Sequence, residues 1–259
     1  SMDLGISGKN ALVTGGSRGL GRQAALSLAG EGVNVAICGR TRTTLDKTVG
    51  ELEALGIKAI GIEADVSDVE GMDDLHRKAV NGLGEVDILV NNAGGTRSRD
   101  DITGTSLEDF KATFDLNVFG GFQLMKTVIP HMQEQAWGRI INIASIWGRE
   151  SGGNISYMSS KAALIGATKH TALAMAKDGI LVNSIAPGSI AHEQGSWERF
   201  QNDNPPEVVA TFIEQNLPMG KFGWPEPVGD LIAFLSSDRG GLITGACIVV
   251  DGGQSYSMI

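Results

Sequence analysis

The stretch NALVTGGSRGLG, residues 10–21, decides the fold of this chain. Its first five residues form a short apolar run that predicts a buried β-strand, and residues 20–29 continue at the period of an α-helix. The glycines between the two elements permit a tight turn that leads the chain directly from strand to helix. The stretch therefore predicts the strand–turn–helix unit with which an α/β domain begins.

Short apolar runs and helical periods keep alternating to the end of the chain. Further strands are expected at residues 33–38, 58–62, 87–91, 139–144, 181–185 and 246–250, and further helices at 43–55 and 156–177. Capping-box patterns at Ser67 and Ser106 are expected to open two more helices. Short right-handed connections then predict an α/β, doubly wound domain over residues 1–259, with a seven-stranded parallel sheet and helices on both faces. The proline-rich region of about 188–227 is expected to be a long substrate loop that acts as a lid.

Composition limits the possible functions. Hydrophobic residues make up 42% and charged residues 20%, as in soluble globular proteins, and no apolar run reaches the roughly 18 residues of a membrane span. The net charge of −9 without a basic stripe is unfavourable for nucleic acid. Without a secretory leader, and with both cysteines in apolar runs, the protein is expected to be cytoplasmic. Its histidines and cysteines lack ligand spacing, so no metal site is expected.

The segment Tyr157-Met158-Ser159-Ser160-Lys161 is the strongest chemical signal. Residues four apart on a helix share one face, so the Lys161 ammonium is expected to favour the Tyr157 phenolate and to lower the pKa of Tyr157 below its ordinary value of about 10. Such a phenol could exchange protons near neutral pH. An isolated Tyr-x-x-x-Lys pattern is usually two exposed helix residues, so the remaining motifs decide between the two interpretations.

The glycine loop suggests what binds beside this pair. Backbone without side chains lets phosphate oxygens approach closely, and the following helix offers N–H groups and a positive dipole end to a pyrophosphate. A glycine-rich turn alone is a weak signal, but its place between the first strand and the first helix favours a dinucleotide. Ser145 follows the strand at 139–144, at the sheet edge where ligands bind in open α/β folds, and its hydroxyl could hold a substrate oxygen.

Four motifs in this order resemble the short-chain dehydrogenase/reductase family: Gly15-x-x-x-Gly19-x-Gly21, Asn91-Asn92-Ala93-Gly94, Tyr157-x-x-x-Lys161, and the region from Ile243-Thr244-Gly245 to Val250-Asp251-Gly252-Gly253. The resemblance covers the whole chain and looks closest to bacterial 3-oxoacyl-carrier-protein reductases. It implies a Rossmann-type fold and hydride transfer between a nicotinamide and a carbonyl or alcohol carbon.

The resemblance also implies residue roles. Tyr157 would exchange the proton, Lys161 would lower its pKa and bind the nicotinamide ribose, and Ser145 would hold the substrate oxygen. Asn117 would hold a water that relays protons to Lys161, or cap a helix break, or both. Asn91 would tie its strand to the neighbouring strands. The implied cofactor contacts are Gly15, Ser17, Arg18, Gly19, Leu20, Gly21, Arg40, Asp65, Val66, Asn92, Ala93, Gly94, Tyr157, Lys161, Pro187, Gly188 and Ile190.

The second strand indicates which dinucleotide is used. A carboxylate at its end would hold the ribose 2′-hydroxyl of NAD, but the strand ends in Cys38-Gly39-Arg40. Arg40 can pair with a 2′-phosphate, and Arg18 could meet the same phosphate from the glycine loop. NADP(H) is therefore the expected cofactor. Asp65 is either an adenine contact or a helix-start residue.

The family pattern is broken at two positions. His192 stands where relatives usually carry a cofactor-binding Thr, so it either alters that contact or is an exposed loop residue. Ala144 leaves Ser145 as the one serine at a place where relatives often have two.

The substrate is expected to be a small ketone or alcohol, or a 3-oxoacyl thioester. It would contact residues 96–99, residues 146–154 with Trp147 in the pocket, and an apolar lid. Arg149 is either an anion ligand or a rim residue, and the acidic net charge is unfavourable for an acidic carrier protein. A non-catalytic, NADP(H)-sensing protein with the same fold is the alternative function. A homotetramer through the helices after the fourth and fifth strands is implied by the resemblance.

Overall fold

Seven strands form one parallel sheet in the computed structural model, which describes residues 2–258. Their order across the sheet is β3-β2-β1-β4-β5-β6-β7. The strands are β1 (Asn10–Thr14), β2 (Asn34–Gly39), β3 (Ala59–Glu63), β4 (Ile88–Asn91), β5 (Gly138–Ile143), β6 (Ile180–Pro187) and β7 (Cys247–Val250). The expected fold class is confirmed. Ser1 and Ile259, the ends of the expected domain, lie outside the described residues.

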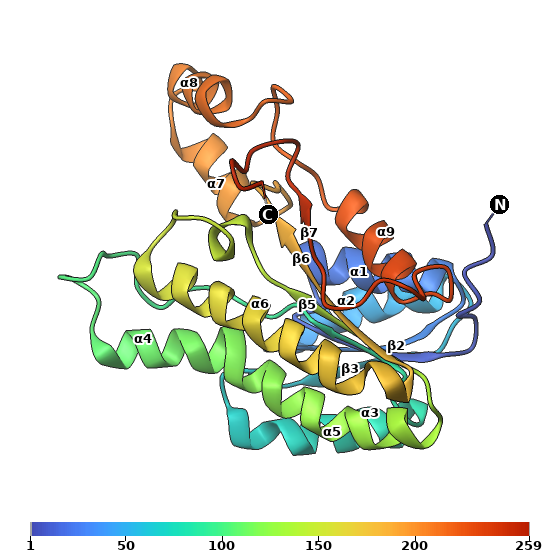
Figure 1. The fold of residues 1–259 in the computed structure, drawn as a ribbon. Coiled ribbons are helices and arrows are strands. Elements are labelled where there is room, and N and C mark those ends of the chain that lie inside the picture. The colour runs from blue at the N-terminus through green and yellow to red at the C-terminus, as the bar shows by residue number, and fades with distance from the viewer. Residues whose placement is uncertain (1, 259) are drawn as a thin grey trace.

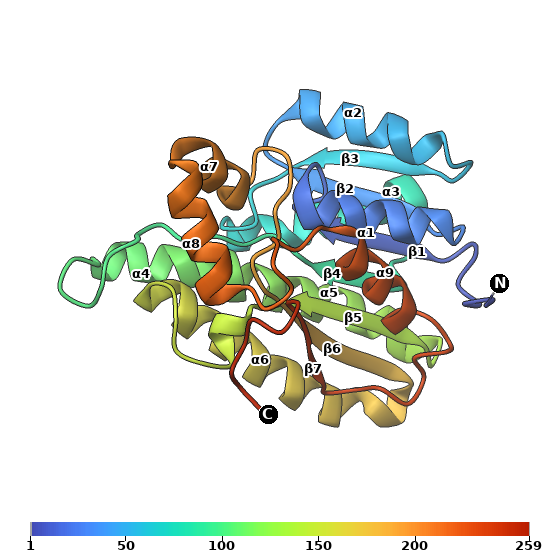
Figure 2. The ribbon, with the colours of Figure 1, turned by 90° about the horizontal axis from the view of Figure 1, so that it is seen from above.

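Helices cover both faces of the sheet (Figures 1 and 2). One face carries α1 (Gly19–Gly30), α2 (Arg42–Glu53) and α9 (Glu226–Leu235). The other carries α3 (Met72–Leu83), α5 (Gly120–Glu134) and α6 (Ile155–Met175), with α4 (Leu107–Phe114) leading into α5. This layering leaves the carboxyl ends of the strands as the place where loops from different crossovers meet.

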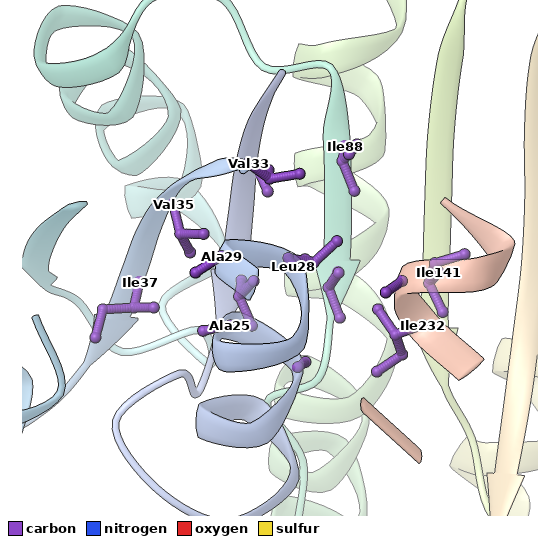
Figure 3. Close-up of a cluster of buried hydrophobic side chains, with 14 of the residues drawn as sticks. Ala25, Leu28, Ala29, Val33, Val35, Ile37, Ile88, Ile141 and Ile232 are labelled. Atoms are coloured by element: carbon purple, nitrogen blue, oxygen red, sulfur yellow. The ribbon is translucent and has the colours of Figure 1, made fainter. Parts of the chain in front are cut away.

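The strands are apolar along their whole length because they are buried on both faces. In β2, Val35 and Ile37 point into the core under α1, whereas Ala36 and Cys38 belong to the core under α3 and α5. Figure 3 shows the first of these cores, where Leu28 of α1 and Ile232 of α9 meet the sheet residues. Burial raises the pKa of Cys38 to about 12, so this thiol is inert packing.

About half of the expected long loop at 188–227 is helical, which corrects the prediction. It contains α7 (Ser196–Asp203) and α8 (Pro206–Asn216), and α9 begins at its end. The prolines that suggested a loop lie where helices accept them: Pro206 begins α8, and Pro225 immediately precedes α9. Figure 1 shows α7 and α8 beyond the carboxyl ends of β6 and β7, and residues 192–222 are called the lid below.

One of the two expected helix caps is correct. Ser106 caps α4 by accepting the N–H of Asp109 at 3.0 Å. Ser67 does not cap the next helix: Asp68 accepts the N–H of Gly71, and a short 3₁₀ turn, η1 (Val69–Gly71), precedes α3. The Ser67 side chain bonds back to Asp65 instead, because a short hydroxyl readily pairs with a carboxylate two residues away.

Candidate active site

The site begins where the ends of β1 and β4 are tied together. The Thr14 hydroxyl accepts the N–H of Asn92 at 2.9 Å and of Ala93 at 3.0 Å, and the Asn92 amide donates to the Thr14 carbonyl at 3.0 Å. The β1 and β4 strands are neighbours at the point where the strand order reverses, and crevices at such switch points bind ligands. Sequence reasoning missed Thr14, although a hydroxyl at the end of the first strand was visible.

The glycine loop requires its glycines. Gly15 and Gly19 have φ of +60° and +57°, in the left-handed region that favours glycine. A Cβ at Gly21 would lie 2.2 Å from the Gly15 carbonyl oxygen, so α1 can begin this close to the loop only without a side chain there. Ser17 and Arg18 complete the turn, and Leu20 lies in the first turn of α1. The first-turn N–H groups have no intrahelical partners and form a site for an anion. The loop therefore fits a dinucleotide pyrophosphate.

Two exposed arginines lie on the side of this crevice where the sequence predicts the adenine half of the cofactor. Arg18 and Arg40 are exposed, and no ion pair within residues 2–258 uses either of them. Burial by itself would raise the pKa of Asp65, but hydrogen bonds from Ser67 and the charges of Arg40 and Arg97 hold it below its ordinary value. Asp65 therefore stays ionised close to Arg40. Both arginines remain available for a phosphate, which fits an NADP-type dinucleotide.

The expected catalytic side chains come together at the end of β5. Tyr157, in the first turn of α6, lies close enough to Ser145, which follows β5, for the serine hydroxyl to act on the pKa of the phenol. Lys161 is 3% exposed; its Nζ donates to the Ile143 carbonyl at 2.7 Å and lies 5.6 Å from the centroid of the Tyr157 ring. The hydroxyls of Tyr157 and Ser145 and the buried amine of Lys161 thus lie together at the carboxyl end of β5. These residues, with Asn117, are called the catalytic corner below.

The pKa values in this corner differ from the sequence prediction. Burial raises the pKa of Tyr157, and the Ser145 hydroxyl offsets this only in part. Burial also lowers the pKa of Lys161 to about 8. The expected lowering of the pKa of Tyr157 is absent because the ammonium bonds the Ile143 carbonyl rather than the phenol, and because desolvation disfavours a phenolate. In the chain by itself Tyr157 is a protonated donor at neutral pH.

Asn117 lies in a π-helical turn, η2 (Asp115–Phe119), between α4 and α5. Its amide nitrogen donates to the Gly95 carbonyl and to Ser160 Oγ, both at 2.8 Å, and its Oδ1 accepts the Gly95 N–H at 2.9 Å. A π-turn frequently marks a functional site, because its extra residue re-aims a side chain. Asn117 thus lies at the helix break expected from the sequence, and its role in holding a water that relays protons to Lys161 stays a prediction.

Gly94 keeps space open between these groups. A Cβ there would lie 3.0 Å from Lys161 Nζ and 3.3 Å from Asn117 Oδ1. The role expected for Asn91 agrees with its contacts, since its amide joins β4 to Asn142 of β5 at 2.9 Å. A side chain at position 94 would therefore crowd the Lys161 amine and the Asn117 amide oxygen, and glycine avoids this.

Asn154 is a site residue that sequence reasoning missed. It caps α6 by accepting the Tyr157 N–H at 2.9 Å, and it also accepts the Thr96 hydroxyl at 3.1 Å. It therefore fixes the backbone that carries Tyr157 and ties it to the loop after β4. An Asn just ahead of the expected helix at 156 is a typical cap signal and could have revealed it.

The lid has its own aromatic core. Trp197, Phe200, Phe212 and Phe222 pack in one cluster, with Trp197 and Phe212 ring centroids 5.0 Å apart. The ends of the lid are pinned together, since Gly223 accepts the N–H of Ala191 at 2.9 Å. The aromatic residues expected in an apolar lid are thus packed against one another. Met219 is exposed instead.

Two residues expected in or near the substrate pocket, Trp147 and Arg149, contact other parts of the protein. The Trp147 ring lies against the Gly152 backbone, where a Cβ would come within 2.1 Å of it. Arg149 donates to the Cys247 carbonyl at 2.8 Å, which is a structural role.

The remaining residues predicted to contact the cofactor follow β6 and β3. Pro187 ends β6, Gly188 has room for no side chain because a Cβ would lie 2.6 Å from Asp251, and Ile190 pairs with Gly223. Val66 is buried. Its carbonyl oxygen lies so close to Gly120 that a Cβ on that glycine would be only 2.2 Å from it. His192 begins the lid and lies against Gly19 of the glycine loop.

Comparisons with known proteins agree with this geometry. A family model described as short chain dehydrogenase matches residues 9–202, so the chain belongs to the short-chain dehydrogenase family of oxidoreductases. Among curated relatives it is similar to the 3-oxoacyl-[acyl-carrier-protein] reductase of Synechocystis sp., with 38% identity over 247 residues, 94% of this chain and 96% of that protein. The (2S)-[(R)-hydroxy(phenyl)methyl]succinyl-CoA dehydrogenase subunit BbsD of Thauera aromatica is 34% identical over 97% of this chain and 98% of its own.

A solved structure extends the similarity to three dimensions. L-sorbose reductase from Gluconobacter frateurii, complexed with NADPH and L-sorbose, aligns with a TM-score of 0.93 and 31% identity over 99% of this chain and 100% of that one. The family recognised from the sequence is thereby confirmed. Within residues 2–258, no helix combines the length and apolar character needed to cross a membrane, and no cluster of metal-ligating side chains occurs.

Proposed function

We propose that this protein is an NADP(H)-dependent oxidoreductase that interconverts a carbonyl and a secondary alcohol, with Tyr157 as general acid and base. The observation that carries the proposal is that Tyr157 and Ser145 lie together beside buried Lys161, at the sheet edge where the glycine loop begins α1. These groups form a proton donor, an orienting hydroxyl and a cation within one corner.

The bound nicotinamide supplies or accepts the hydride, and the chain manages the proton. In reduction, the Tyr157 O–H donates to the carbonyl oxygen as negative charge develops there. The Ser145 hydroxyl holds the same oxygen in line. The ammonium of Lys161 stabilises the phenolate that forms when Tyr157 has donated its proton. Asn117 holds a water that relays protons to Lys161. Tyr157 is protonated at neutral pH, the form that donates its proton in reduction.

The preference for NADP(H) over NAD(H) rests on the two exposed arginines. Arg40 follows β2 where a carboxylate would select NAD, and Arg18 extends from the glycine loop. Two guanidinium groups can hold the 2′-phosphate, which NAD lacks. The L-sorbose reductase structure contains NADPH, which supports the same assignment.

The substrate class is a ketone or secondary alcohol, with a 3-oxoacyl thioester as the specific alternative. Relatives named 3-oxoacyl-[acyl-carrier-protein] reductase support the thioester, and the similarity to L-sorbose reductase supports a polar ketone. The net charge of −9 is unfavourable for an acidic carrier protein.

We also propose a homotetramer. Apolar side chains are exposed on the helices expected at its contacts: Phe119 and Phe122 around the start of α5 and Leu173 on α6. The β7 strand is an apolar sheet edge, and an unpaired edge is stabilised when a second copy covers it. Sedimentation that gave only a monomer at micromolar concentration would refute this assembly.

The test of the activity follows NADPH oxidation with small ketones, ketoses and 3-oxoacyl thioesters. We expect turnover with at least one class, and we expect Tyr157→Phe to lower kcat/KM by about 10³-fold while NADPH binding persists. Tyr256→Phe is the matched control, because that tyrosine is 88% exposed and outside the site.

Each contrary result has a distinct meaning. Full activity of Tyr157→Phe would exclude Tyr157 as the acid, and a preference for NADH would overturn the cofactor assignment. Tight NADPH binding without turnover on every substrate would favour the non-catalytic sensor.

A further inference from the structure

His192, the first residue of the lid, packs against the glycine loop. The Cβ position built on Gly19 is 2.8 Å from Cε1 and 2.9 Å from Nε2 of its ring, and the Cβ position of Gly195 is 2.7 Å from Cε1. The imidazole is therefore half-buried between the loop that fits a pyrophosphate and the first turn of the lid. Glycine at both positions leaves room for the ring.

The hydrogen bonding of the ring determines what it presents to that loop. Its Nδ1 is 3.1 Å from the Glu193 carbonyl oxygen, and a carbonyl can only accept, so Nδ1 carries a proton. Nε2 then faces Gly19 as an acceptor when the imidazole is neutral and as a donor when it is protonated. A neutral ring thus repels an anionic oxygen at this place, and an imidazolium attracts one.

We propose that His192 links dinucleotide binding to proton uptake. Its imidazolium donates through Nε2 to an oxygen of the pyrophosphate held over Gly19, and the proton comes from solvent when the neutral ring is the starting form. The inference rests on the proposed function, because it requires that the glycine loop hold a dinucleotide.

The other charged groups on the glycine loop, on α1 and in the first turn of the lid are arginines and glutamates. Arg18 and Arg22 belong to the glycine loop and α1, and Arg22 pairs with Glu51 at 2.7 Å. On the lid, the Glu198 carboxylate accepts the Gln194 N–H at 2.6 Å, and Arg199 donates to the Gln194 carbonyl at 2.9 Å. Glu193 is exposed. Among these guanidinium and carboxylate groups, His192 supplies the imidazole, the side chain suited to take up a proton on binding.

The experiment measures NADPH binding by fluorescence, without substrate, from pH 6.0 to 8.0. Between pH 6.0 and pH 8.0, the NADPH affinity of the wild type is expected to fall about tenfold more than that of His192→Gln. The reason is that only the wild type loses a charge-assisted hydrogen bond. The 2′-phosphate of NADPH also titrates in this range, but it contributes equally to every variant. His192→Lys keeps a cation at every pH and is expected to bind tightly throughout. His170→Gln, an exposed histidine on α6, is the matched control and should follow the wild type.

Calorimetry in two buffers of different ionisation enthalpy gives the second measurement. Near pH 7 the wild type should take up a fraction of a proton more than His192→Gln and His192→Lys on binding. Superimposable pH profiles and equal proton uptake in the wild type and His192→Gln would overturn the inference. So would tighter binding by His192→Gln at all pH values, which would identify the ring as an obstruction. Failure of the wild type to bind NADPH at any pH would instead refute the proposed cofactor, so the two failures are distinguishable.

Discussion

The catalytic corner and the lid are held by different forces. In the corner, polar groups that are almost fully buried bond one another or backbone: Lys161 to Ile143, and Asn117 to Gly95 and Ser160. In the lid, the contacts are between aromatic rings, whose preferred separations span a range of about 4.5–7 Å. Directional bonds fix atoms to within a few tenths of an ångström, whereas ring packing keeps a shape but tolerates sliding.

This difference separates reaction from selection. A proton transfer needs a donor at a fixed distance from the reacting oxygen, which the corner supplies. Acceptance of a substrate needs a surface that closes over it, which a lid with pinned ends and its own core can supply. Substitutions in the corner should therefore act on kcat, and substitutions in the lid should act on KM.

Lys161→Met should give the largest effect. Loss of the cation should lower kcat by about 10²- to 10³-fold, because the Ser145 hydroxyl, which also favours the phenolate, is uncharged and cannot replace the ammonium. The same change should stabilise the fold, because burial lowers the pKa of Lys161 to about 8 and the folded protein carries that cost below pH 8. The gain is expected to be on the order of 2 kcal/mol in chemical denaturation at pH 7, reduced by the unpaired Ile143 carbonyl.

The pH dependence of that gain has a defined sign. Between pH 8 and about 10.5 the unfolded chain binds more protons at this lysine than the folded chain, so wild-type stability rises with pH and the advantage of Lys161→Met shrinks. Lys169→Met, an exposed site on the same helix, is the control and should show neither effect. A destabilised Lys161→Met at every pH would mean that the hydrogen bond to Ile143 outweighs the burial of the charge.

Arg40→Ser should give the next largest effect and should act on binding alone. Loss of a charge-assisted contact is expected to weaken NADPH binding by about 10- to 100-fold, with little change for NADH. Arg42→Ser is the matched control, because that side chain pairs with Glu63 at 3.2 Å and should leave the preference within about twofold. Equal weakening of NADPH and NADH in Arg40→Ser would indicate a general electrostatic effect and no 2′-phosphate contact.

The corner was predictable from sequence because its signals are local. The glycine loop, the Tyr157–Lys161 spacing and Ser145 after a strand each follow from residues near one another along the chain, and strand order brings them together. Asn91 and Arg40 likewise occupy strand ends that periodicity locates. The pKa values were not predictable, since they depend on how much of Tyr157 and Lys161 the finished fold buries.

The lid was predictable only as a region. Prolines suggested a loop, although Pro206 occupies a position that begins a helix. The aromatic cluster joins residues of α7, α8 and the segment before α9, and no single periodic pattern contains them. The position of His192 over Gly19 depends on how the whole lid folds back, more than 170 residues along the chain from the glycine loop.

Phe212→Ala tests the lid side of the comparison. Phe212 contacts the rings of Trp197, Phe200 and Phe222, and each aromatic pair contributes about 0.5–1.5 kcal/mol beyond its buried area. The lid should loosen, raising KM for the ketone by about tenfold while kcat stays within about threefold. Steady-state kinetics gives both constants, with Val208→Ala on the exposed side of α8 as the control. A hundredfold loss of kcat in a folded variant would show that the lid takes part in the chemistry. It would contradict the division between a corner that acts on kcat and a lid that acts on KM.

Glu150→Gln should give the smallest effect, and it probes the link between the two regions. The Glu150 carboxylate lies between Ser145 and Asn154 in sequence and accepts the Ser255 hydroxyl at 3.0 Å and the Ser257 N–H at 2.6 Å. The same C-terminal segment reaches the base of the lid, where Gln254 accepts the Ser189 N–H at 2.8 Å.

An amide accepts fewer hydrogen bonds than a carboxylate, so the tail should loosen at Glu150 but stay attached at Ser189. We expect KM to rise by about threefold, kcat to stay constant, and the Ser257 amide to exchange hydrogen about tenfold faster. Glu53→Gln, an exposed change at the end of α2, should alter none of these. Faster exchange with an unchanged KM would mean that the tail is attached to both regions without coupling them, so that the corner and the lid respond to substrate independently.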